Sequence, residues 1–248
     1  MPTQTLTVDF SKAFPLFPLP GVVLLPHGVA PLHVFEDRYR AMTRRALDGA
    51  GLIAMASIAP PGVPTAPGRE AEGEPDTDDP PLRPAVCLGY ISQHERLDDG
   101  RYHMLLQGIA RAEITEELTP GEGGFRRARL RPLGAEGQSQ DAEEVAAAAD
   151  RLLRRRPELN ELLEDPELQK LAAVARLSEW LEDTLPTEAV CDVVSMTLVQ
   201  EDPLRYALLA EPDAPRRLDA VLQFLRQTRA SLKSADDAPR DAGGYLLN

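Results

Sequence analysis

Short apolar runs separated by prolines, glycines and acidic residues fill the first half of the 248-residue chain. Such runs are typical of β-strands joined by turns. They predict strands at residues 22–25, 30–33, 52–58, 86–96, 101–107, 109–118 and 125–133. Because Pro15, Pro18 and Pro20 lack backbone N–H donors, we expect residues 14–20 to form an extended edge segment or a buried loop.

Two turn signals and one helix organise this strand-rich half. Leu97–Gly100 ends in Asp-Gly, which is typical of a hairpin, and Gly108 interrupts an apolar run, which predicts a β-bulge or a sharp bend. A helix is expected where apolar residues recur every three or four positions, at Phe35, Tyr39, Met42 and Ala46. The first half therefore predicts a small, curved, mostly antiparallel sheet with one helix.

After Asp141 the apolar residues recur with a helical period. Start signals such as Asp-Pro and capping residues predict helices at 142–156, 166–181, 187–198, from 202 onward, and 215–232. We therefore predict an α+β chain with three parts. Residues 1–133 would form a β pseudobarrel, residues 134–232 a helical bundle, and residues 233–248 a flexible tail.

Residues 60–84 contain eight prolines, three glycines and six carboxylates. A segment of this composition has little to bury, so we expect a disordered, acidic, proline-rich loop between two strands of the barrel.

The net charge of −13 lies mainly in this loop and in the helical half, where residues 133–230 alone contribute −9. Long-range repulsion then disfavours nucleic acid and anionic membranes as partners. The sequence has no apolar run of about 18 residues and no visible secretory signal. Cys87 and Cys191 lie far apart without a CxxC pair, which favours buried, reduced thiols and a cytoplasmic protein.

Three blocks of sequence resemble the N-terminal substrate-recognition domain of the Lon protease family. The first comprises PLFPLP at 15–20, VLLPHG at 23–28 and PLHVFEDRYR at 31–40. The second comprises residues 86–91, LDDGRY at 97–102 and LLQGIAR at 105–111, and the weaker third comprises LLAE at 208–211 with Asp213 and RRL at 216–218. The resemblance covers nearly the whole chain. His27 stands where that family usually has glycine, and Asp37 where it often has proline.

The resemblance implies a PUA-like β pseudobarrel joined to a helical bundle, and a role in selecting protein substrates. The ATPase and protease domains of Lon are not expected here, because the sequence contains no GxxxxGK[ST] loop for nucleotide phosphates. We expect a stand-alone member of the family in which a groove between barrel and bundle takes extended polypeptide segments.

Candidate chemical sites are weak. The cluster of His33, Glu36, Asp37 and Arg38 lacks a nucleophile. We expect Glu36 to pair with Arg40, and we expect Arg38 and His33 to tie the helix to the barrel. His94 and His103 would face each other across the hairpin, but two ligands are too few for a zinc site.

The sequence also gives little support for a catalytic site. Lys170 and Ser178 lie two helical turns apart, too far for a Ser-Lys dyad, and Ser195 lies inside a helix. The triple arginine 154–156 would complement the dipole at a helix end.

Arg127, Arg129 and Arg131 share one strand face, where we expect solvent or the acidic bundle as their partner. These arginines keep open an RNA-binding alternative, and a hydrolase with an unrecognised site is the other alternative. Our main prediction is a non-enzymatic module that binds proteins, without catalytic, metal or cofactor residues.

Overall fold

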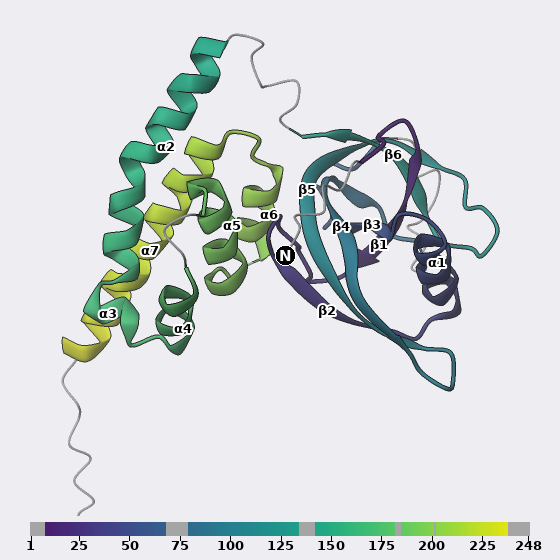
Figure 1. Ribbon diagram of the computed structural model, residues 1–248, viewed down its shortest axis with the longest axis horizontal. Coiled ribbons are helices and arrows are strands. Elements are labelled where there is room, and N and C mark those ends of the chain that lie inside the picture. The colour runs from purple at the N-terminus through teal and green to yellow at the C-terminus, as the bar shows by residue number, and fades with distance from the viewer. Residues whose placement is uncertain (1–7, 68–78, 134–141, 182–184, 201, 238–248) are drawn as a thin grey trace, which may run out of the picture.

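The computed structural model describes residues 8–67, 79–133, 142–181, 185–200 and 202–237. It shows an α+β fold in two adjoining parts, a strongly curved sheet and a group of helices (Figure 1). No helix within the described ranges is long and apolar enough to cross a lipid bilayer.

Six strands and one helix make up the first part. The strands are β1 (Ala13–Leu19), β2 (Val29–Val34), β3 (Leu52–Ile58), β4 (Leu82–Arg96), β5 (Tyr102–Leu118) and β6 (Arg127–Pro132), and the helix is α1 (Asp37–Leu47). They run in the order β2-β5-β4-β3-β1-β6, and β5 also pairs with β6, which closes the sheet into a barrel. The helix α1 lies on the side of the barrel away from the other helices (Figure 1).

The long β4–β5 hairpin confirms both turn predictions. Its Asp-Gly turn has Gly100 at a φ of 82°, and the pairing register shifts where Leu88 faces Ala110 but Gly89 faces Gly108. A side chain at Gly108 would place its Cβ 2.1 Å from the carbonyl oxygen of Leu25. The chain therefore bends at Gly108 so that another part of the backbone can pass directly over it.

Several expectations for the first part were wrong. Residues 22–25 form no strand, although Val23, Leu24 and Leu25 are buried. The proline-rich β1 is neither an edge nor a loop, because it pairs with β6 over Ala13–Pro15 and with β3 over Leu16–Leu19. Each half of β1 pairs with a neighbouring strand on one side. A proline nitrogen, which has no N–H to donate to that strand, can therefore point to the opposite side of β1.

The expected loop at 60–84 is partly ordered. Strand β4 begins at Leu82, whose carbonyl accepts a hydrogen bond from the N–H of Ala66, and the side chain of Leu82 is 1% exposed. Burial of this leucine against the barrel explains why its end of the segment is ordered. Residues 68–78, at the centre of the predicted loop, lie outside the described ranges.

The second part contains α2 (Ala142–Leu163), α3 (Pro166–Gln169), α4 (Ala172–Trp180), α5 (Thr187–Leu198), α6 (Asp202–Ala210) and α7 (Ala214–Asp237). The expected helix at 166–181 is divided into α3 and α4, and α7 extends beyond the predicted start of the tail at residue 233.

Helix α2 does not end near Arg156, as expected, but continues through Pro157 to Leu163. An internal proline costs a helix about 3 kcal/mol. Leu159, Leu162 and Leu163 lie beyond it and are at most 5% exposed in the core of the bundle. Since each buried leucine contributes about 1.5–3 kcal/mol, their burial outweighs the cost of the proline. The arginines at 154–156 therefore do not sit at a helix end.

Buried side chains fill the junction between barrel and bundle. Arg111 of β5 donates two hydrogen bonds to the carboxylate of Asp192 in α5, at 2.5 and 3.0 Å. The hydroxyl of Tyr206 in α6 accepts a hydrogen bond from the N–H of Ala85 in β4 at 2.8 Å. Tyr206 and Leu209 also belong to the core of the barrel. The expected binding groove at this junction is thus occupied by the protein itself.

Candidate functional site

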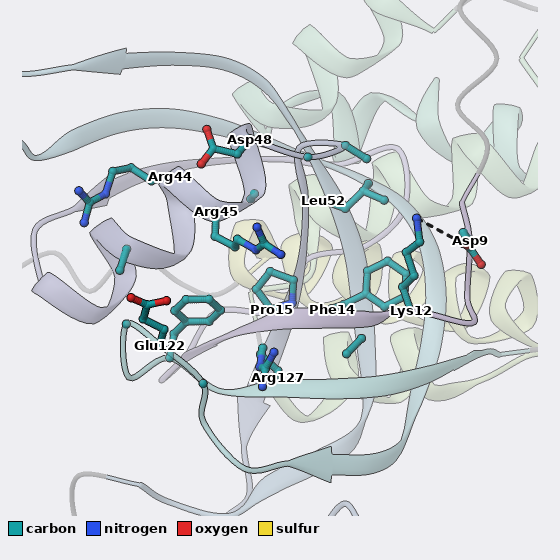
Figure 2. Close-up of a pocket in the computed structure, with 18 residues that line it drawn as sticks. Asp9, Lys12, Phe14, Pro15, Arg44, Arg45, Asp48, Leu52, Glu122 and Arg127 are labelled. Atoms are coloured by element: carbon teal, nitrogen blue, oxygen red, sulfur yellow. Dashed lines mark ion pairs between the residues drawn. The ribbon is translucent and has the colours of Figure 1, made fainter.

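A pocket of about 980 Å³ lies at the end of the barrel beside α1 (Figure 2). We call it the barrel pocket. Its walls come from α1 and the residues after it, from β1, and from the turn between β5 and β6. The lining residues are 9, 12–15, 41, 44–46, 48–50, 52, 121–123, 125 and 127.

The pocket exists because β1 and β3 separate at one end. The two strands are in register from the pair Leu16–Ala54 onward. On the other side, Ala13–Pro15 pair with β6. Among the described residues of β1, Ala13 therefore has no strand partner on the side that faces β3, and its backbone forms part of one wall of the pocket.

The floor of the pocket is apolar. Phe14, Phe125 and Leu52 contribute to it, each between 5% and 8% exposed. The β5–β6 turn approaches α1 closely, since a Cβ on Gly123 would lie 3.0 Å from the Cβ of Ala41. Gly123 also has a φ of 97°, which residues with a side chain rarely adopt, so glycine is needed to bring the turn over the floor.

Charged side chains surround this floor. Lys12 pairs with Asp9 at 3.5 Å, and hydrogen bonds from the side chain and backbone of Ser11 lower the pKa of Asp9. The remaining charges come from Arg44, Arg45, Arg127, Asp48 and Glu122.

Within the described part of the chain, none of these five remaining groups forms an ion pair. The Nε of Arg127 is buried without a hydrogen-bond partner, and its Nη2 donates a bond of 3.3 Å to the Thr119 carbonyl. The barrel pocket thus combines apolar surface, free backbone and guanidinium groups that form no ion pair with a described carboxylate.

A second pocket of about 410 Å³ lies over β2, β4 and β5 and contains three histidines. The prediction that His94 faces His103 was wrong, because the bulge between Ile91 and Gln93 shifts the register and places Glu95 opposite His103. His103 instead lies beside His33, with ring centroids 4.8 Å apart. Across the described ranges, the structure brings together no group of three or more His, Cys, Asp or Glu side chains that could hold a metal.

The charged cluster before α1 has a structural arrangement that differs from the expected one. Arg40 pairs with Asp37 at 2.9 Å rather than with Glu36, and Glu36 instead accepts a bond from Arg38. His33 is exposed and does not tie the helix down. Arg40 does so, since its Nε donates to the carbonyl of Gly100 at the hairpin turn.

The residues considered for catalysis have other partners. Lys170 pairs with Glu167 at 2.7 Å, and the Ser178 hydroxyl donates to the carbonyl of Ala175. The Ser195 hydroxyl donates to the carbonyl of Cys191. These contacts account for both serines as ordinary helix residues, without a dyad.

The strand arginines are mostly neutralised by the neighbouring strand rather than by the bundle. Arg129 pairs with Glu116 at 3.0 Å and Arg131 with Glu113 at 2.7 Å. Both glutamates lie on β5, which pairs with β6. This arrangement removes most of the positive charge on which the RNA-binding alternative rests.

Comparison with known proteins agrees with this architecture. The sequence model of the ATP-dependent protease La (LON) substrate-binding domain matches residues 13–227. The chain belongs to this family. Lon protease 2 of Myxococcus xanthus is 26% identical over 228 residues, which cover 91% of this chain and 25% of that protein. Lon protease of Helicobacter pylori is 22% identical over 227 residues, which cover 90% of this chain and 24% of that protein. This LON substrate-binding domain thus spans about a quarter of the length of the curated relatives that it matches.

The fold of the LON substrate-binding domain is also shared with a solved structure. The N-terminal domain of the Mycobacterium avium complex Lon protease aligns with a TM-score of 0.58 at 16% identity, over 87% of this chain and 98% of that one. One departure from the family pattern has a clear structural effect. His27, a position at which the resemblance to the family leads us to expect glycine, has a φ of 63° and is the one residue other than glycine with a positive φ among those described.

Proposed function

We propose that this chain binds extended or partly unfolded segments of other proteins, catalyses no reaction on them, and thereby selects substrates for proteolysis. Membership of the LON substrate-binding domain family carries this proposal. The barrel pocket supports it, because a floor of phenylalanine and leucine beside unpaired strand backbone suits a polypeptide better than a small polar molecule.

A cytoplasmic location is part of the same proposal. Cys87 and Cys191 are free and buried, which is consistent with a reducing compartment. Burial raises the pKa of both thiols to about 12, so neither is suited to act as a nucleophile at neutral pH.

The test compares one protein in two states. A small disulfide-bonded protein is labelled, and half of it is reduced and alkylated so that it stays unfolded. We expect saturable binding of the unfolded form in an anisotropy titration and at least about tenfold weaker binding of the native form, because the native form has buried its apolar segments. Failure to bind the unfolded form at concentrations up to about 100 μM would contradict the proposal.

A further inference from the structure

The barrel pocket contains arginines that form no ion pair with a described carboxylate. Many arginines of this chain pair with a carboxylate, including Arg40, Arg111 and Arg131. Arg45 and Arg127 do not pair with any described carboxylate, although the chain carries a net charge of −13. Other arginines, such as Arg96 and Arg151, also form no ion pair with a described carboxylate. Arg45 and Arg127 differ from them in lining one pocket.

The two side chains occupy matching places on the wall of the pocket. In Figure 2, Arg45 extends from α1 toward Pro15, and Arg127 lies on the other side of Pro15. Arg44 points away from this position. The carboxylates Asp48 and Glu122 lie farther out in the same view, above the end of α1 and beside the turn. The part of the pocket next to β1 is therefore cationic, and its acidic groups lie at the margin.

The backbone of β1 just before Pro15 can accept another strand. Ala13 has no β3 partner, so its N–H and its carbonyl stand unpaired on the side away from β6. Pro15 has no N–H, and the strand register directs its carbonyl to the N–H of Ala54. One residue of an incoming extended segment would pair with the N–H and the carbonyl of Ala13, as in other cases of strand addition.

We propose that the barrel pocket binds an extended polypeptide segment along the free edge of β1, with an acidic side chain of the segment between Arg45 and Arg127. This site rests on the proposed function and specifies its substrate class. An apolar neighbour of the acidic residue lies over Phe14, because alternate side chains of a strand point to opposite faces. Preferred substrates then combine acidic and apolar residues.

The test uses two labelled nonapeptides of Ala, Val and Leu that differ only in carrying Glu or Gln at two positions. Binding is measured by fluorescence anisotropy at about 50 mM and about 500 mM salt. At low salt we expect the Glu peptide to bind roughly three- to fivefold more tightly than the Gln peptide, as for a partly exposed ion pair. At high salt we expect the difference to fall below about twofold, since the charges are screened.

Variants of the protein test whether Arg45 and Arg127 cause the preference for the Glu peptide. The double variant Arg45→Gln with Arg127→Gln should abolish the preference for Glu and leave the affinity for the Gln peptide unchanged. Because Arg127 is partly buried, Arg45→Gln alone, on an exposed side chain, serves as a second variant and should remove about half of the preference on a logarithmic scale. The control double variant Arg96→Gln with Arg151→Gln removes the same charge from exposed side chains outside the pocket and should retain the preference.

A blocking variant tests the site independently of charge. Ala50 is exposed and lines the pocket, so Ala50→Trp should fold normally and weaken both peptides at least about tenfold. Equal affinity for the Glu and Gln peptides, or an equal loss of preference in the control double variant, would overturn the site. Binding of the unfolded protein that persists in Ala50→Trp would also overturn it while leaving the proposed function intact. If the unfolded protein does not bind the wild-type chain, the proposed function itself is wrong.

Discussion

Replacing Arg111 with methionine should lower the free energy of unfolding by about 3 kcal/mol, because it removes one partner of a buried ion pair. The side chains of Arg111 and Asp192 are 8% and 4% exposed, so water cannot replace the lost partner. Arg217 is close enough to both groups to interact electrostatically, and burial followed by the charge of Arg111 lowers its pKa. Arg217 remains near Asp192 in this variant and limits the damage.

Replacing Asp192 instead of Arg111 should lower the free energy of unfolding by a larger amount. Asp192→Leu leaves two buried guanidinium groups, Arg111 and Arg217, without their shared carboxylate, so we expect a loss of about 5 kcal/mol. The double variant Arg111→Met with Asp192→Leu should lose clearly less free energy of unfolding than the sum of the two single variants. The reason is that a buried ion pair replaced by apolar residues of similar size is often tolerated.

Urea unfolding followed by circular dichroism measures all three variants and the wild type at one pH and one salt concentration. The matched control is Arg131→Met, which breaks an ion pair whose side chains are 44% and 33% exposed and should cost at most about 1 kcal/mol. A loss below about 1 kcal/mol for Arg111→Met, or one no larger than that of the control, would refute the assignment of Arg111 as the main polar link between barrel and bundle.

Three further predictions concern single positions. His27→Gly should stabilise the fold by about 0.5–1 kcal/mol in the same urea assay, because it relieves a left-handed backbone that costs a side-chain-bearing residue about 1–2 kcal/mol, and a destabilised variant would contradict this. Gly108→Ala should unfold at markedly lower urea than the wild type, since its Cβ would clash with the Leu25 carbonyl at 2.1 Å; an unchanged midpoint would show that the bend is not tight. Cys87 and Cys191 should resist alkylation at pH 8 until the chain is unfolded in urea, because burial raises the pKa of both thiols to about 12, and rapid labelling of the folded protein would show that they are accessible.

Much of the fold could be predicted from local sequence, but the candidate site could not. The Asp-Gly hairpin, the bend at Gly108 and helix α1 each follow from a few neighbouring residues. The barrel pocket instead joins residues 9–15, α1 and the β5–β6 turn, which are far apart in the chain. Arg45 carries no local signal, and the alternation of arginines at 127, 129 and 131 predicts a basic strand face but not a pocket shared with α1.

Register errors have a similar cause. The sequence places His94 opposite His103 only if the hairpin is regular, and a bulge near Ser92 shifts the pairing by one residue. Sequence periodicity also ended α2 at Arg156, because local rules assign a high cost to Pro157. Contacts with the bundle core, which are long-range, outweigh that cost.

The sequence alone determined the two-part α+β organisation, most of the elements and the resemblance to Lon, because hydrophobic period, turn residues and family motifs are properties of neighbouring positions. Only the tertiary structure decided that β1 separates from β3, that the junction is filled by Arg111 and Asp192, and that unpaired arginines collect beside α1. These features depend on which surfaces of distant segments meet when the barrel closes. Closure of the barrel is therefore what creates the candidate site.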